Sequence, residues 1–273
     1  MRMANPSGFA LLQKKAPLVG AFFMGVIWHF PALAFCPLPG SPQQVAVRQV
    51  VDGDTLRLVD GRSVRLIGIN APEIGRNGRS SEPYAEAARQ RLQALVKASD
   101  GRIGLEPGVE SKDKYGRTLA HIYGRNGDNI EAQLLSEGLG YRVAVAPNVR
   151  LSACQQLAEQ AARKAGSGLW RRSPVVRAGD VRQSGFAVIA GRIEGVERNR
   201  GGVWLNLDGA VVLQVPARLQ RNFPASFFDN LKGRQVEARG WVLDRSRKGG
   251  LKPGQRRWLL PLTDPSMLER ISG

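Results

Sequence analysis

Residues 50–73, VVDGDTLRLVDGRSVRLIGINAPE, constrain the fold of this chain more than any other stretch. Apolar and polar residues alternate on both sides of Asp60-Gly61. Such alternation is typical of β-strands with one buried face, and Asp-Gly is a strong signal for a two-residue hairpin turn. The stretch therefore predicts a β-hairpin in which Leu56 faces Arg65.

This hairpin is expected to gather polar groups at one end. With the predicted pairing Asp54 faces Ile67, and Asn70 follows about 10 Å further along the strand. If the sheet curls, Asn70, Ala71 and Glu73 return to the neighbourhood of Asp54. Oxygen ligands, a carboxylate and a strand arginine would then share one end of a small barrel. This combination suits a hard cation and a phosphate ester.

Three short motifs carry a family resemblance. They are Asp52-Gly53-Asp54-Thr55, residues 65–73, and Asp113-Lys114-Tyr115-Gly116-Arg117. Together they resemble the staphylococcal nuclease (thermonuclease) family, in its order and at nearly its spacing. The resemblance covers residues 43–170. It implies a mainly β fold, an OB barrel with helices packed around it, and nuclease activity for residues 43–172.

The resemblance also implies catalytic roles. Arg65 and Arg117 match the two arginines that hold the scissile phosphate, since a guanidinium binds two phosphate oxygens at once. Glu73 matches the general base that activates the attacking water. Asp113 is expected to support the pocket, with its role left open.

A calcium site follows from the same comparison. Asp54, the Asn70 side chain and the Ala71 carbonyl match the calcium ligands of the family. The family commonly has an aspartate at the Asn70 position, so we expect weaker calcium binding here. Ala144 and Ala146 stand where the staphylococcal enzyme has tyrosines that contact the nucleotide, so base stacking by those side chains is expected to be lost.

Periodicity extends this picture along the first half of the chain. Strands are expected at 45–50, 104–110 and 118–123, and helices at 82–97, 130–137 and 149–164. Ser81 is a candidate N-cap for the first of these helices. The loop 75–79 is basic and is either a lid over substrate or a solvated loop.

The second half has a different pattern. Residues 173–182 are expected as a linker, and residues 183–273 as a second OB-fold barrel. Its strands are expected at 186–196, 203–207, 211–215, 236–243 and 258–262, with a helix at 219–231. Helix after the third of five strands is the OB-fold order.

Basic loops of this second half are candidates for nucleic-acid binding. They contain Arg198, Arg200, Arg245, Arg247, Lys248, Lys252, Arg256 and Arg257. Trp204, Trp241 and Trp258 lie on the adjoining strands, and they either stack on bases or belong to the core.

The overall charge agrees with a polyanionic partner. The 273 residues carry a net charge of +17 and have a pI of about 10.9. Nucleic acid is the expected partner of such a chain. A basic surface that serves solubility alone is the alternative.

Residues 1–34 have the pattern of a signal peptide. A basic start is followed by an apolar run over residues 16–30, and Ala32-Leu33-Ala34 has the form of an A-x-A cleavage site. This predicts cleavage after Ala34 and a periplasmic or secreted protein without a membrane span. An uncleaved N-terminal anchor is the alternative.

Cys36 and Cys154 are the two cysteines of the chain. In an exported protein this count favours a disulfide between them. The alternative is a buried free thiol at Cys154.

The resemblance, the charge and the leader together predict an exported, calcium-dependent nuclease of DNA or RNA with an accessory OB domain. A degenerate barrel that binds nucleic acid or another polyanion without cutting it is the alternative. The presence of Arg65, Glu73 and Arg117 favours the enzyme.

Overall fold

The computed structural model describes residues 36, 38, 40–247 and 249–271. The expected signal peptide and Lys248 therefore lie outside the described residues. Residues 34–273 form one compact unit. No helix in the described ranges is both long and apolar enough to cross a membrane.

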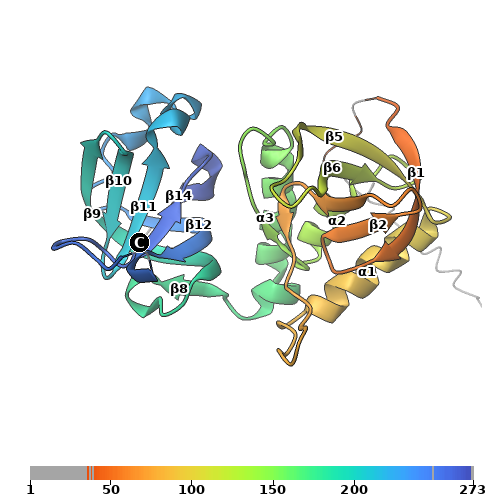
Figure 1. Cartoon of the computed structure of the whole chain (residues 1–273), viewed down its shortest axis with the longest axis horizontal. Coiled ribbons are helices and arrows are strands. Elements are labelled where there is room, and N and C mark those ends of the chain that lie inside the picture. The colour runs from red at the N-terminus through yellow and green to blue at the C-terminus, as the bar shows by residue number, and fades with distance from the viewer. Residues whose placement is uncertain (1–35, 37, 39, 248, 272–273) are drawn as a thin grey trace, which may run out of the picture. The chain divides into compact units, whose positions relative to one another are not determined.

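A closed barrel forms the first half of this unit (Figure 1, red to green). Its strands are β1 (Gln43–Val50), β2 (Thr55–Leu58), β3 (Ser63–Leu66), β5 (Arg102–Lys112) and β6 (Thr118–Tyr123). They close in the order β1-β2-β3-β6-β5, with β3 and β6 parallel. Leu56, Val64 and Ile103 are fully buried inside it. The expected barrel is confirmed.

The hairpin of β2 and β3 differs from the prediction by one residue. Thr55 pairs with Arg65, and Leu56 pairs with Val64. The connection is a three-residue loop in which Gly61 has a φ of 90°, as such loops need. The predicted two-residue turn was wrong because it would set buried Leu56 opposite a charged side chain. The observed register sets two apolar residues on the same buried face.

Three helices pack on this barrel: α1 (Ala85–Ala98), α2 (Ile130–Ser136) and α3 (Ser152–Ala165). Helix α1 begins after Tyr84, which has a φ of 67°, and no side chain caps it. Ser81, the expected cap, instead accepts a hydrogen bond from the Gly75 N–H (3.0 Å). That expectation was wrong because Pro83 lies between Ser81 and the helix, and the residue before a proline avoids the helical conformation.

Cys36 and Cys154 form a disulfide with an S–S distance of 2.10 Å. The bond joins α3 to the start of the described chain, across a separation of 118 residues. The predicted pairing is therefore present in the structure.

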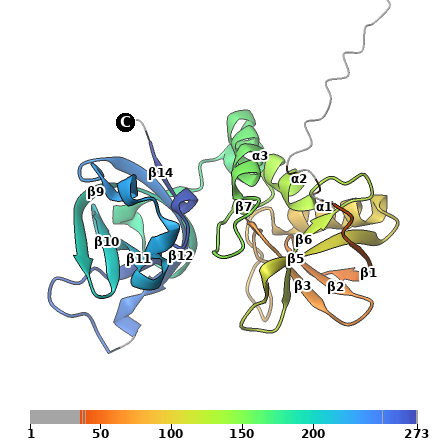
Figure 2. The ribbon, with the colours of Figure 1, turned by 90° about the horizontal axis from the view of Figure 1, so that it is seen from above.

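A second closed barrel follows (Figure 2). Its strands are β9 (Gly185–Asn199), β10 (Gly202–Leu207), β11 (Val211–Pro216), β12 (Gln235–Asp244) and β13 (Trp258–Pro261). They close in the order β9-β10-β11-β13-β12, because β12 also pairs with β9. This is the strand order of the first barrel, again with the third and fifth strands parallel. Both predicted barrels, and all five strands predicted for this half, are present.

Two segments of the second half differ from expectation. The predicted helix at 219–231 was wrong: two 3-10 helices stand there, η3 (Ala217–Asn222) and η4 (Ala225–Phe228). Pro224 lies between them and has no N–H to continue a helix. Within the expected linker, β8 (Val175–Arg177) pairs in parallel with β9 and so extends the second sheet.

Charged side chains join α3 to β12. Arg239, which is 1% exposed, forms ion pairs with Glu159 of α3 and with its neighbour Glu237. Arg163 of α3 reaches the same Glu237 at 2.6 Å. Ala144 belongs to the apolar core of the second barrel. The two barrels therefore share a contact built from buried charges and apolar packing.

Candidate active site

The turn between β1 and β2 places two acids against the loop that follows β3. A Cβ at Gly53 would lie 2.6 Å from the Cβ atoms of both Ala71 and Ala88. Only glycine therefore lets the Asp52-Gly53-Asp54 turn approach α1 this closely. The Ala71 N–H donates to Asp54 Oδ2 at 2.7 Å, so the polar segment does return to Asp54.

Asp54 is a buried carboxylate that forms an ion pair with one of the described residues, Arg65. Its side chain is 5% exposed, and Arg65 Nη1 lies 2.9 Å from Oδ2. Burial raises the pKa of Asp54 to about 7, Arg65 opposes this rise, and the charge of Asp52 adds to it. Burial and Asp52 therefore disfavour the ionised form of Asp54, and a bound cation would stabilise it.

Arg65 points into this group of oxygens. Its Nη1 also donates to the Ile69 carbonyl (2.9 Å), and its Nη2 donates to Asn70 Oδ1 (3.2 Å). Strand β4 (Ile69–Asn70) pairs with β7 (Tyr141–Arg142), which sets Asn70 opposite Tyr141. The structure thus places Arg65 among the expected metal ligands, where its guanidinium stands in for a cation.

These contacts test whether the residues fit calcium. The oxygens around the guanidinium are a carboxylate of Asp54, an amide of Asn70 and a backbone carbonyl, the ligand types that Ca²⁺ takes. Ala71, whose carbonyl was expected as a ligand, offers its N–H to Asp54. Among the described residues, no group of three or more His, Cys, Asp or Glu could hold a metal. The donor types fit calcium, with one carboxylate at their centre.

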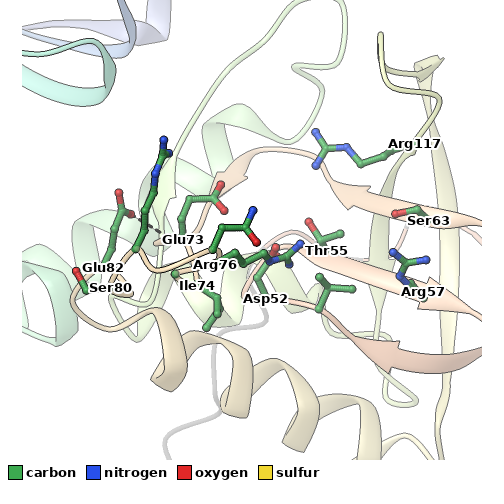
Figure 3. Close-up of a pocket in the computed structure, with 14 residues that line it drawn as sticks. Asp52, Thr55, Arg57, Ser63, Glu73, Ile74, Arg76, Ser80, Glu82 and Arg117 are labelled. Carbon is green, nitrogen blue, oxygen red and sulfur yellow. Dashed lines mark hydrogen bonds between the residues drawn. The ribbon is translucent and has the colours of Figure 1, made fainter.

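Glu73 lies at the edge of this site and is exposed to the cleft (Figure 3). Its backbone N–H donates to Glu82 Oε2 at 2.9 Å, which holds the loop in place. Partial burial raises the pKa of Glu73, and repulsion from Asp52 raises it further. A raised pKa makes the carboxylate a stronger acceptor for a proton from water.

Arg117 is oriented by Asp113, whose role the sequence left open. Asp113 Oδ1 accepts the backbone N–H groups of Tyr115 and Arg117, and Oδ2 accepts Arg117 Nε at 2.7 Å. Burial works against ionisation, but these bonds lower the pKa of Asp113 below its ordinary value. The terminal amino groups of Arg117 have no hydrogen bond within the described residues, and the side chain extends toward the cleft (Figure 3).

Two cavities meet at these residues. One has a volume of about 860 Å³ and is shown in Figure 3; Asp52, Thr55 and the loop 75–79 contribute to its wall. The other has a volume of about 870 Å³. Its wall includes Arg65, Asn70, Asp113, Tyr115 and Trp241. Glu73 and Arg117 line both cavities, so a carboxylate and a guanidinium face the same space.

Several arginines expected to bind nucleic acid through the second barrel are already paired. Arg256 lies 2.6 Å from Glu194, and Arg257 lies 2.8 Å from Asp244. Arg247 approaches the same Asp244 at 3.9 Å. The local acids therefore neutralise part of the loop that looked strongly basic in the sequence.

One cavity of about 690 Å³ gathers part of the candidate set. It is lined by Trp204, Arg245, Arg256 and Arg257. The Arg245 guanidinium lies 5.5 Å from the centre of the Trp204 ring. Trp258 is 4% exposed and belongs to the core. Arg198, Arg200 and Lys252 are exposed but do not line this cavity.

Comparison with known proteins agrees with this geometry. Residues 63–172 match the family model described as staphylococcal nuclease homologue. A thermonuclease of Staphylococcus intermedius is 35% identical over 130 residues, 46% of this chain and 75% of the relative. Endonuclease YncB of Bacillus subtilis is 32% identical over 137 residues, 48% of this chain and 64% of the relative. A probable endonuclease of Aspergillus flavus, lcl3, is 29% identical and matches 40% of this chain and 43% of the relative.

Proposed function

Because this chain belongs to the staphylococcal nuclease family and is a nuclease, we propose that it is an exported, calcium-dependent enzyme that hydrolyses phosphodiester bonds of DNA or RNA. The observation that carries the proposal is the meeting of Glu73 and Arg117 at two adjoining cavities. The side-chain oxygens of Asp54 and Asn70, which are suited to bind a cation, lie in the same region.

The proposed roles follow from these positions. Glu73 takes the proton of the attacking water. Arg117 binds phosphate oxygens through its terminal amino groups and stabilises the charge that grows on them. Asp54, Asn70 and Ala71 would hold the calcium ion, which when bound supplies positive charge at the phosphate. Arg65 is proposed as the second residue that binds the phosphate. To reach the phosphate, its guanidinium would have to move away from Asp54 and Asn70.

Export is supported by the chemistry of the chain. Disulfides persist mainly in oxidising compartments, and Cys36 is paired with Cys154. Cleavage after Ala34 would leave Cys36 near the start of the mature protein. A periplasmic or secreted location is therefore part of the proposal.

Cleavage in a gel cast with DNA tests the proposed activity. We expect the purified protein to clear the gel with calcium and to leave it intact with excess chelator. Equal clearing in chelator would overturn the calcium requirement. A protein that clears no DNA or RNA but still binds them would be a degenerate, nucleic-acid-binding barrel.

Asn70→Asp is expected to tighten calcium binding. Each added carboxylate strengthens attraction for the ion, and Asn70 Oδ1 already faces a cation, the Arg65 guanidinium. We expect the calcium concentration for half-maximal cleavage to fall by about tenfold. Calorimetric titration with calcium, without substrate, should show the same change.

Asn77→Asp is the matched control, because it adds the same charge to the loop 75–79 and not beside Arg65. We expect its calcium titration to follow that of the wild type closely. If Asn70→Asp also follows the wild type, Asn70 does not face the metal and the ligand set is wrong.

The second barrel is proposed as an accessory binding site for single strands. Arg245 and Trp204 pair a cation with an aromatic ring in one cavity, which suits phosphate contact and base stacking. Arg245→Gln should weaken binding of a single-stranded oligonucleotide and reduce the slope of log K against log salt by about 0.7. Arg125→Gln removes an equally charged surface residue that pairs with Asp100, and its slope should stay close to wild type. Equal slopes for wild type and Arg245→Gln would remove Arg245 from the binding site.

A further inference from the structure

Trp241 is a large aromatic side chain that the core of the second barrel does not use. Along β12, Val236, Ala238 and Val242 point into that core. Residues at alternate positions of a strand point to the opposite face, and Trp241 shares that face with Glu237 and Arg239. Its exposed fraction is 40%. The strand therefore fixes the position of Trp241, and part of its side chain remains exposed to solvent.

The charged residues on that face fix where Trp241 lies. Arg239 pairs with Glu159, and Glu237 pairs with Arg163, both on α3. These contacts hold the outer face of β12 against the first barrel. Trp241 is the next residue on the same face, two positions along the strand.

Trp241 reaches the candidate active site. It lines the cavity of about 870 Å³ together with Arg65, Glu73 and Arg117. Of the described residues that line this cavity, it is the one that comes from the second barrel. It also lines an adjoining cavity of about 900 Å³ that contains Asn70 and Glu73. Trp241 therefore shares its cavities with the groups that would act on the phosphodiester.

A row of aromatic rings supports the indole. Phe186 of β9 is the cross-strand neighbour of Trp241, with ring centres 5.4 Å apart and an edge-to-face arrangement. The ring centres of Phe186 and Tyr141 lie 5.1 Å apart, and those of Tyr141 and Trp170 lie 5.8 Å apart. Such contacts favour one ring orientation. Trp241 is thus a braced, partly exposed aromatic surface.

We propose that Trp241 binds an unpaired nucleobase of the substrate by stacking, in the active-site cavity next to the scissile phosphate. This inference rests on the proposed function. Every base offers a flat π-face, and stacking on an exposed aromatic ring needs no particular sequence. Bases inside a duplex are already stacked on one another, so the site selects single strands or locally opened duplexes.

Steady-state cleavage of a single-stranded oligonucleotide tests the proposal. Trp241→Ala should raise KM by about ten- to a hundredfold, the range seen when a stacked aromatic is removed, with kcat changed much less. Trp241→Phe should retain most of the wild-type KM, because it keeps an aromatic face. Leu243→Ala is the matched control: Leu243 lies on the same face of β12, is 48% exposed, and is absent from the active-site cavity.

A second measurement separates stacking from a merely structural role. An abasic nucleotide is moved along the oligonucleotide, one position at a time, around a fixed cleavage site. Wild type should lose efficiency when the abasic position is the one that meets Trp241, and Trp241→Ala should show no such position. Thermal melting of each variant verifies folding.

The outcomes distinguish this inference from the proposed function. If wild type cuts, but Trp241→Ala keeps both the wild-type KM and the wild-type abasic profile, the inference is wrong and the nuclease function stands. If wild type cuts no nucleic acid, the proposed function fails and the stacking site fails with it.

Discussion

Glu73→Gln is expected to slow phosphodiester hydrolysis by a factor on the order of 10²–10⁴, while nucleic-acid binding stays near wild type. Glutamine keeps the shape of the side chain but takes no proton from water. Glu73 and Arg117 line the same two cavities. The loss of rate should therefore appear in kcat. Single-turnover cleavage rates and equilibrium binding to the same oligonucleotide would measure the two effects separately.

Glu110→Gln provides the control, because Glu110 lines the same cavity as Glu73 and has no assigned role. Its rate should be close to wild type. A Glu73→Gln variant with full activity would show that another group is the base.

The pH dependence of the cleavage rate is an independent test of Glu73 as the base. Burial and Asp52 raise the pKa of Glu73 above its ordinary value of 4.5. A base acts only when it is ionised, so the wild-type rate should fall as the pH drops through a value above 4.5. Glu73→Gln should lack the part of this fall that Glu73 causes, because glutamine does not titrate, whereas protonation of Asp54, whose pKa is about 7, should affect both proteins alike.

The barrel could be predicted because its signals are local. Alternation on both sides of Asp60-Gly61 defines two strands, whichever turn joins them. The register was not local: it was decided by the burial of Leu56 against Val64 inside the closed barrel. A turn dipeptide alone does not contain that information, so the prediction was off by one residue.

The same distinction applies to the site. The hairpin, in a sheet that curls, predicted that Asn70 would return to the neighbourhood of Asp54, and a hydrogen bond from Ala71 to Asp54 joins their segments. The orientation of Arg65 toward Asp54 and Asn70 had no sequence signal. The sequence identified Trp241 only as one of three tryptophans on predicted strands. Its place in the cavity could not be predicted, because it depends on how β12 packs against α3.

That contact between β12 and α3 should also dominate the response of stability to mutation. Arg239→Met is expected to lower the free energy of unfolding by about 3–5 kcal/mol, as for other buried ion pairs that lose one partner. Arg239 is 1% exposed, and without it Glu159 and Glu237, at 2% and 7% side-chain exposure, lose a shared cation. Denaturation by urea, followed by circular dichroism, would measure the change.

Two variants make this prediction specific to the buried network. Arg177→Met removes an arginine whose side chain is 85% exposed and pairs with Asp180, and we expect no measurable shift in its urea midpoint. Glu237→Gln added to Arg239→Met should recover part of the lost stability, because Glu159 and Glu237 would otherwise share Arg163, and the glutamine removes one of these two buried charges. Equal urea midpoints for wild type and Arg239→Met would show that the network contributes nothing to folding.

Acid should weaken the network in wild type. Burial opposes ionisation of Glu237, but its bonds to Arg163 and Arg239 lower the pKa below the ordinary value of 4.5. A carboxylate with a lowered folded-state pKa stabilises the protein fully above its unfolded-state pKa. That contribution is lost as the pH falls through the lower folded-state value. The Glu237→Gln variant should therefore lose less stability than wild type as the pH falls from about 5 into the acid range.

The same ion pairs should also affect substrate binding. Because Trp241 lies on the same strand face, KM for single-stranded substrate should rise in Arg239→Met even at neutral pH. A normal KM in that variant would show that Trp241 keeps its position without the ion pairs.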